Sequence, residues 1–587
     1  MRVLKWIFNN FLFIATLVLL AFIPLNPKIP LLDVGNTWVY VRSEDFLVSL
    51  VFFVWLVLLL FKKITFKTPL TLPILLFWII GGISTLHGVL LLFPTLSNVF
   101  SNVAFLSMLR RIEYISLFFV AYSAMKEKKL ISYTVFALAI ILLLIVGYGF
   151  GQKFYGFPAY LTMNEEFAKG VPIRLSELSR IPSTFAGHYD LAAYLVLVIP
   201  IFVSVVFGFK NWMVKIFFLT VSSLGFALLF MTVSRVSFFV LFLSLVMLLI
   251  FQKKKLVILS LFALTFLLLI FSPSLLARFG STVSEVDVLV DASTGRAIGH
   301  VKEVEATYFE NKIVLRQHIS DQDTEAASTS AILPYSLIPA HAALVVESNS
   351  PTGENLPRGT SYINLPLSPV TKKVEQYFYQ KSDQGGEKPE EIKVFYGDFL
   401  IKKAKAYDLS FTTRFQGEWP RTLTAFSRNI FLGSGYGSVS LAVDNDYLRI
   451  LGETGLLGFI SFFLIFLVAG IYIKKIFPNV DSPVARSFIL GFVAGTFGLI
   501  LNAVLIDVFE ASKVAFTFWL LMGLAIGILG LYKKDDVDLF KEVKRVLSST
   551  YAIIIYLLII TFVLFSPGFG YYFTGDGAKR DKDGYYW

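Results

Sequence analysis

The chain alternates long apolar runs with short polar connections, a pattern typical of a protein that crosses a membrane many times. A membrane-spanning α-helix needs about 20 predominantly apolar residues. About thirteen runs approach this length, at about 6–23, 45–61, 69–93, 106–125, 130–150, 189–209, 212–232, 236–251, 256–277, 454–473, 485–507, 513–532 and 550–566. The pattern therefore predicts an all-α polytopic membrane protein with about 12–13 transmembrane helices and one large polar loop at about 278–453.

Composition excludes a soluble protein of this length. Of the 587 residues, 56% are hydrophobic and only 16% are charged, whereas soluble domains carry about 25% charged residues. The absence of cysteine excludes disulfides, thiolate metal sites and a cysteine nucleophile. The five histidines form no paired metal-binding motif.

The basic residues indicate how the helices are oriented. With a cytoplasmic N-terminus, the inside connections hold the lysine groups at 62–67, 126–129, 210–215, 253–255, 474–475 and 533–545, as the positive-inside rule requires. Arg110 and Arg111 are exceptions near the outer side. The net charge of +11 is thus a topology signal, and we expect no nucleic-acid partner. Residues 278–453 are predicted to lie outside the cytoplasmic membrane.

The external stretch contains an acidic insert. Residues 281–398 hold 17 acidic and 10 basic residues, a net charge of −7. Three short stretches are candidate strands, namely 286–291, 313–315 and 344–346, and the first ends in the turn-like Ser293-Thr-Gly. The pattern predicts a small, β-rich, partly irregular insert. A solvated spacer is the alternative interpretation.

These boundaries divide the chain into four parts. We expect an N-terminal transmembrane bundle at 1–277, the insert at 278–398, an external segment at 399–453, and C-terminal helices with a short tail at 454–587. A helical pattern follows the insert at about 399–430, where Arg414, Glu418 and Arg421 share a helix face. Pro420 must then lie in a first helical turn.

Four external arginines are candidate ligand contacts: Arg180, Arg235, Arg414 and Arg421. A charge at a membrane boundary needs a partner or a function, and guanidinium groups suit bidentate recognition of a pyrophosphate. The alternative is that each arginine anchors a helix end at the lipid headgroups. His188 begins a predicted span, where it contacts ligand or serves as an interfacial histidine.

Asp444 and Asp446 form an Asp-x-Asp pattern between a glycine-rich turn, residues 433–437, and the next predicted span. Three interpretations are open for this pattern. Asp444 could accept a proton from a sugar hydroxyl as a general base, the pair could bind a divalent metal, or Asp444 could cap the helix that follows. The glycines follow no clear strand, so we expect them to turn the backbone toward the bilayer and toward a ligand rather than form a dinucleotide loop.

In this order, these segments resemble the O-antigen ligase and Wzy-type polymerase superfamily. The matching segments are Arg180-Ile-Pro-Ser-Thr-Phe, Ser234-Arg235, Arg414 with Trp419, Asn429-Ile-Phe-Leu-Gly-Ser-Gly-Tyr-Gly, and Asp444-Asn-Asp-Tyr-Leu followed by Glu453-Thr-Gly-Leu-Leu-Gly. The resemblance covers most of 1–275 and 401–532. It implies a GT-C-like glycosyltransferase that moves a glycan from undecaprenyl pyrophosphate onto an acceptor hydroxyl at the outer face of the inner membrane. The resemblance also implies that transfer needs no nucleotide sugar, no metal and no other cofactor.

The resemblance also implies roles for individual residues. Arg235 and Arg414 would hold the pyrophosphate with support from Arg180, and Asp444 would deprotonate the acceptor. His188, Arg421, Tyr436, Asn445 and Tyr447 would line the substrate site. Expected partners are the lipid-linked donor, the glycan acceptor, membrane lipids and other polysaccharide-assembly proteins.

One departure from the family pattern affects the functional prediction. The ligase branch carries histidine where this chain has Asp444, which favours a polymerase over a ligase that attaches glycan to a lipid or protein. A non-catalytic lipid-oligosaccharide flippase is a second alternative, although the notable charges gather at the outer rim rather than within spans. A degenerate member whose insert recruits partners is a third.

Overall fold

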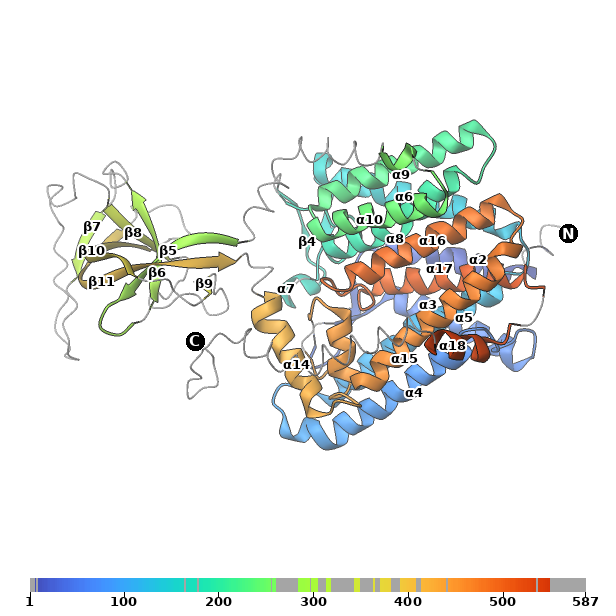
Figure 1. Ribbon diagram of the computed structural model, residues 1–587, viewed down its shortest axis with the longest axis horizontal. Coiled ribbons are helices and arrows are strands. Elements are labelled where there is room, and N and C mark those ends of the chain that lie inside the picture. Colours follow the sequence, from blue (N-terminus) through green and yellow to red (C-terminus); the bar gives the residue numbers. More distant parts are fainter. Residues whose placement is uncertain are drawn as a thin grey trace. The chain divides into compact units, whose positions relative to one another are not determined.

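The fold of the 587-residue chain was analysed in a computed structural model (Figure 1). It describes residues 6–259 apart from 7, 8, 38, 163, 164, 177, 178 and 255; 283–295, 297–304, 313–317, 343–348, 363–364, 370–381 and 391–407; and 413–548 apart from 440, 441, 535 and 536. The chain divides into two compact units. The first comprises 1–275 and 418–552, and the second comprises 276–417 and 553–587.

The first unit is helical. Its long helices are α2 (Phe11–Leu25), α3 (Ser43–Leu60), α4 (Thr71–His87), α5 (Ser101–Ala124), α6 (Leu130–Tyr155), α8 (His188–Val206), α9 (Trp212–Thr232), α10 (Arg235–Phe251), α15 (Asp446–Ile476), α16 (Pro483–Asn502) and α17 (Ser512–Gly530). Shorter helices are α7 (Glu165–Ala168), α14 (Trp419–Arg428), α18 (Leu539–Leu547), the π-helical η1 (Gly88–Leu92), and the 3₁₀ turns η2 (Phe93–Thr95) and η6 (Phe477–Asn479). Two short hairpins, β1–β2 (Pro30–Leu32, Val41–Arg42) and β3–β4 (Ala159–Tyr160, Pro172–Ile173), complete it.

Eight helices in the described part of the chain are long and apolar enough to cross a membrane, which supports a multi-pass membrane protein. Two shorter apolar helices, α2 and α10, also match predicted runs. Helix α5 matches the 106–125 run but carries Arg110, Arg111 and Glu113. The predicted runs at 256–277, beyond Leu259, and at 550–566 lie outside the described residues.

Small residues allow the central helices to approach closely. Helix α8 packs against α9, α10 and α16, and α17 packs against α5 (Figure 1). A Cβ added to Gly495 of α16 would lie 2.2 Å from the Leu197 carbonyl oxygen of α8, and one added to Gly523 of α17 would lie 2.4 Å from the Phe118 carbonyl oxygen of α5. Glycine therefore permits helix spacings at which a side chain would clash.

The second unit is a seven-stranded sheet. Its strands are β5 (Val283–Asp291), β6 (Ala297–Val304), β7 (Ile313–Gln317), β8 (Ala343–Ser348), β9 (Ile363–Asn364), β10 (Val370–Lys381) and β11 (Glu391–Tyr407), in the order β10-β8-β6-β5-β11-β7, with β9 on β11. Strand β11 also pairs with β10, so the sheet curls back on itself. Leu289, Leu344, Tyr377, Phe399 and Ile401 form its core.

The prediction of a β-rich insert is confirmed, because all three candidate stretches are strands. The turn prediction at Ser293-Thr-Gly is confirmed as well. Asp291 Oδ1 accepts the Ser293 and Thr294 N–H groups at 2.8 and 2.9 Å, and Gly295 has φ +68°. Of the polar stretch between 320 and 371, most lies outside the described residues.

The prediction of helix from residue 399 onward is wrong as far as Tyr407. These residues continue β11, where Phe399 and Ile401 face the sheet core while Lys402 pairs with Val370 of β10. Alternation of apolar and lysine residues therefore outweighed the helical pattern. Helical structure begins only at the π-helical η5 (Thr413–Glu418) and continues as α14, with Pro420 in its first turn as predicted.

Candidate functional site

The turn that precedes α15 places Asp444 outside the helix. Asn445 is the helix N-cap: its Oδ1 accepts the N–H groups of Tyr447 and Leu448 at 3.0 and 2.9 Å. The interpretation of Asp444 as the cap is therefore wrong. Asp444 is half-buried and adopts φ +52°, a left-handed conformation that is uncommon for a residue other than glycine. Backbone strain of this kind is concentrated at functional sites.

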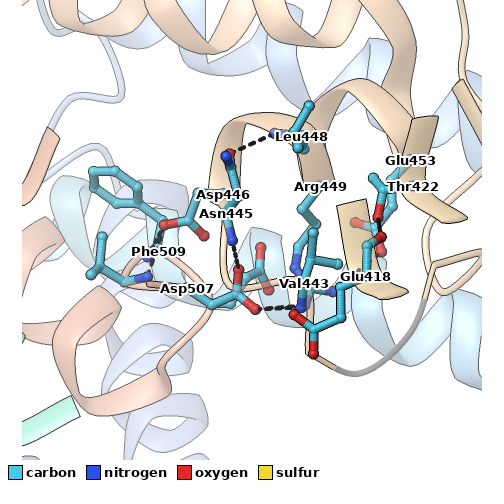
Figure 2. A network of polar contacts seen from close by, with 12 residues as sticks. Glu418, Thr422, Val443, Asn445, Asp446, Leu448, Arg449, Glu453, Asp507 and Phe509 are labelled. Atoms are coloured by element: carbon cyan, nitrogen blue, oxygen red, sulfur yellow. Dashed lines mark hydrogen bonds and ion pairs between the residues drawn. The ribbon is translucent and has the colours of Figure 1, made fainter. Parts of the chain in front are cut away.

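Asp507, between α16 and α17, holds this turn in place (Figure 2). Its carboxylate accepts the Val443 N–H at 3.0 Å and the Asn445 N–H at 3.1 Å, one on each side of Asp444. Arg449 Nη2 donates to Asp507 Oδ2 at 2.8 Å. Burial opposes ionisation of Asp507, but the Arg449 guanidinium outweighs it and holds the pKa of Asp507 below its ordinary value.

Asp446 has a structural role. Its side chain is 1% exposed, and Oδ2 accepts the N–H groups of Val508 and Phe509 at 2.8 and 3.0 Å (Figure 2). Its own N–H donates to the Ala503 carbonyl at 3.0 Å. Asp446 thus fixes the 503–511 connection against the start of α15. In the described part of the chain, no three histidine or carboxylate side chains form a group that could hold a metal ion.

Arg180 and His188 form a pair at the start of α8. Arg180 Nη1 lies 2.8 Å from His188 Nε2, and His188 is 7% exposed. An arginine can only donate, so Nε2 accepts and the imidazole is neutral with its proton on Nδ1. The two residues that the sequence singled out separately therefore act as one unit, with the guanidinium oriented by the ring.

Arg235 begins α10, immediately after the N-cap Ser234. Ser234 Oγ donates to Ser237 Oγ at 3.0 Å, and Asn502 Nδ2 of α16 donates to the same Ser237 oxygen at 3.1 Å. These buried hydrogen bonds fix the start of α10 against the end of α16. The half-buried Arg235 therefore projects from a rigid helix end.

Short links join these elements into one region of the helical unit. Ile181, next to Arg180, donates its N–H to the carbonyl of Met231, four residues before Arg235, at 3.3 Å. Residues 502 and 503 connect the start of α10 to Asp446 through the bonds described above. Asp190, two residues after His188, interacts electrostatically with Asp444 and Asp507. Arg180, His188, Arg235 and Asp444 are thereby grouped around the ends of α8, α10 and α16.

Other predicted site residues have identifiable structural contacts. Tyr447 OH donates to the Ile500 carbonyl at 2.5 Å. Tyr436 is buried, with the Arg111 guanidinium 5.2 Å from its ring centre. Arg421 is exposed on α14, whereas Arg414 is buried and lies on the π-helical η5, in a part of the chain that belongs to the second unit. The 3.6-residue spacing that predicted a shared face for these arginines does not apply across a π-helix.

The glycine-rich turn lies close to the backbone of neighbouring helices. Gly433, Gly435 and Gly437 all have positive φ, and a Cβ on Gly433 would lie 2.6 Å from the Gly455 nitrogen. Gly455 itself kinks α15 with φ +64°. The glycines turn the backbone, as expected, and their approach to the bilayer and to a ligand stays a prediction. The close approach at Gly433 and Gly455 is between protein backbones.

The sequence analysis did not predict an ionic network that joins Arg449 and Asp507, next to the Asp444 turn, to Arg111. Arg449 pairs with Asp507, Arg111 pairs with Glu510 and lies 3.3 Å from Glu453, and Arg449 lies 3.8 Å from Glu453. The available signal was Arg111, which violated the positive-inside pattern. Its acidic partners, the buried Glu453 in α15 and the half-buried Glu510 in the 503–511 connection, account for a basic residue at that position.

A scan of the chain against models of known protein families finds no match. The geometry of the helical unit is therefore the basis for assigning a function.

Proposed function

We propose that the chain is a membrane glycosyltransferase that polymerises lipid-linked glycans. It would move an oligosaccharide or polysaccharide from undecaprenyl pyrophosphate onto a sugar hydroxyl at the outer face of the inner membrane. The observation that carries the proposal is the position of Asp444. Asn445, not Asp444, caps α15, and Asp507 accepts hydrogen bonds from the backbone on both sides of Asp444, which has a positive φ.

In the proposed reaction Asp444 acts as the general base. The acceptor hydroxyl oxygen attacks the anomeric carbon of the donor glycan while its proton passes to Asp444. The bond between that carbon and the pyrophosphate oxygen breaks, and undecaprenyl pyrophosphate leaves with the electron pair. Asp507 supports this role through the backbone, because its ion pair with Arg449 fixes the residues on both sides of Asp444.

Arg235 and Arg180 are the proposed contacts to the leaving pyrophosphate. Preorganised cationic donors stabilise charge that develops in the transition state. Arg235 stands on a helix end fixed by Ser237 and Asn502, and Arg180 is oriented by His188. The grouping of these arginines near Asp444 favours transfer over transport, because a flippase needs no base beside its pyrophosphate contacts.

A polymerase is preferred to a ligase because an aspartate stands where the ligase branch has histidine. The test is the cell-surface glycan of a strain that lacks the chain, complemented with wild type or Asp444→Asn. We expect single repeats that remain attached but no long chains, and no rescue by Asp444→Asn expressed at the wild-type level.

Other phenotypes would identify the alternatives. Complete loss of attachment, with long chains retained on the lipid carrier, would indicate a ligase. Accumulation of lipid-linked single repeats on the cytoplasmic face would indicate a flippase. Full rescue by Asp444→Asn would contradict the assignment of Asp444 as the base in any of these enzymes.

A further inference from the structure

A cavity of about 320 Å³ lies between the first halves of α3 and α5. Val48, Phe52 and Leu109 are among its apolar lining residues, and Asp45, Arg110 and Glu113 are its charged ones. The cavity is distinct from the candidate site: Arg110 lines the cavity, whereas the next residue, Arg111, joins the ionic network with Glu453 and Glu510.

The charged groups of the cavity are incompletely matched. Arg110 Nη2 lies 3.9 Å from Asp45 Oδ2 and donates to the Tyr40 carbonyl at 3.1 Å. The same Asp45 oxygen accepts the Arg42 N–H at 2.8 Å. Glu113 Oε1 is buried and accepts no hydrogen bond from the described residues. The cavity thus presents two carboxylates and one guanidinium, and one carboxylate oxygen needs a donor.

We propose that this cavity binds the headgroup of an aminophospholipid of the phosphatidylethanolamine type. Arg110 would bind the phosphate, and Glu113 would accept a hydrogen bond from the primary ammonium. Residues three apart on a helix have Cβ atoms about 5–6 Å apart, so the Arg110 guanidinium and the Glu113 carboxyl lie at a separation that suits the adjacent phosphate and ammonium of this headgroup. The exposed apolar side chains of Phe46, Leu50 and Leu109 provide a surface for the acyl chains.

The charge of the cavity distinguishes this occupant from other lipids. An anionic headgroup or a pyrophosphate could bind Arg110 but would bring no ammonium group for the Asp45 and Glu113 carboxyl groups. A choline headgroup carries a positive charge but has no N–H to donate to Glu113 Oε1. The inference does not depend on the proposed glycosyltransferase activity, because the cavity shares no residue with the candidate site.

Lipid retention by the purified full-length protein tests the proposal. The protein is exchanged into an equimolar mixture of phosphatidylethanolamine, phosphatidylcholine and phosphatidylglycerol with identical chains, and the tightly bound lipid is measured by native mass spectrometry. A hydrogen bond to a charged group corresponds to roughly tenfold in affinity. We therefore expect about five- to tenfold enrichment of phosphatidylethanolamine over phosphatidylcholine.

Matched variants locate the binding site. Glu113→Gln should abolish the preference for phosphatidylethanolamine, whereas Glu165→Gln, the same change at an exposed position of α7, should retain it. Arg110→Gln should weaken binding of both zwitterionic lipids. Leu109→Trp, which narrows the cavity without altering charge, should also reduce retention of both and serves if Glu113→Gln does not fold.

Three results would overturn the proposal. The first is wild-type protein that retains the lipids in their input ratio. The second is a preference for phosphatidylglycerol, which would assign the cavity to anionic headgroups. The third is an undiminished preference for phosphatidylethanolamine in folded Glu113→Gln, or undiminished retention of both zwitterionic lipids in folded Leu109→Trp.

Discussion

Arg449 and Asp507 form a buried ion pair, 2.8 Å from Nη2 to Oδ2, that braces the backbone on both sides of Asp444. The pair joins the first turns of α15 to the connection between α16 and α17. A carboxylate that receives a guanidinium and two backbone N–H groups is a rigid anchor. In the proposed mechanism Asp444 therefore performs the chemistry, whereas Asp507, paired with Arg449, positions it.

Asp507→Asn should destabilise the protein and reduce transfer. The amide preserves shape but removes the carboxylate that pairs with the buried Arg449 at 2.8 Å. Breaking a buried ion pair costs about 3 kcal/mol or more. We expect a lower unfolding temperature for the detergent-solubilised protein, whereas Asp481→Asn, which disrupts the exposed pair with Lys128, should change it little.

Acid should affect the wild type and Asp507→Asn differently. The folded-state pKa of Asp507 lies below its ordinary value, so its stabilising contribution is complete at neutral pH and is lost as the pH falls through that lowered value. The acid-induced loss of stability should therefore be smaller in Asp507→Asn. Identical acid profiles for the two proteins would contradict a stabilising role for this carboxylate.

Substitution of Asp444 should reduce activity without loss of stability, whereas substitution of Asn445 should reduce stability. Asp444→Asn retains size and polarity but removes the base, so transfer should fall by about 10²-fold with the unfolding temperature unchanged. Asn445→Ala removes the helix cap and should cost about 1 kcal/mol of stability. Glycan chain length in membranes and thermal unfolding of the purified protein measure the two effects. Loss of stability in Asp444→Asn without loss of transfer would assign Asp444 a structural role.

Arg235→Lys should impair transfer although the charge is retained. Lysine lacks the planar fork that binds a pyrophosphate through two parallel hydrogen bonds, so we expect the chain-length distribution to shift strongly toward single repeats. Arg428→Lys, at an exposed position near the end of α14, is the matched control. A wild-type distribution of glycan chain lengths in Arg235→Lys would indicate that Arg235 only anchors the helix end.

Two glycines of α15 provide a paired test of the kink. A Cβ on Gly455 would lie 2.3 Å from the Phe431 carbonyl oxygen, and its φ of +64° disfavours any other residue, whereas a Cβ on Gly470 meets nothing within 4 Å. Gly455→Ala should cost at least about 2 kcal/mol, and Gly470→Ala should change stability by less than about 1 kcal/mol. Equal unfolding temperatures for the two variants would show that position 455 accepts a side chain without loss of stability.

Reporter fusions test the orientation of the external stretch. A reporter inserted between residues 281 and 398 should read out as extracytoplasmic, because helix alternation and lysine placement agree there. A reporter at Lys254 should read out as cytoplasmic. Labelling of the insert only after the membrane is permeabilised would contradict the proposed mechanism, since Asp444 would then face the wrong compartment.

The sequence alone determined the membrane class, because spans of about 20 apolar residues follow from bilayer thickness and need no tertiary information. It also identified parts of three of the seven strands of the insert, namely β5, β7 and β8, since alternating or β-branched stretches are a local signal. It misassigned residues 399–407, where the lysines and alanines fit both periods and pairing with β5 and β10 decided in favour of strand. Residue type likewise suggested Asp444 as a helix cap, a position that Asn445 takes in the structure.

Only the tertiary structure decided the composition of the candidate site. Asp507 lies 63 residues after Asp444, and its carboxylate reaches the Asp444 turn only because α16 returns the chain to the start of α15. Arg180 and His188 are eight residues apart, yet a local pattern does not reveal which nitrogen of the ring accepts the guanidinium. Such contacts depend on helix packing, which the glycines of α16 and α17 permit by letting backbones approach to distances that a side chain would prevent.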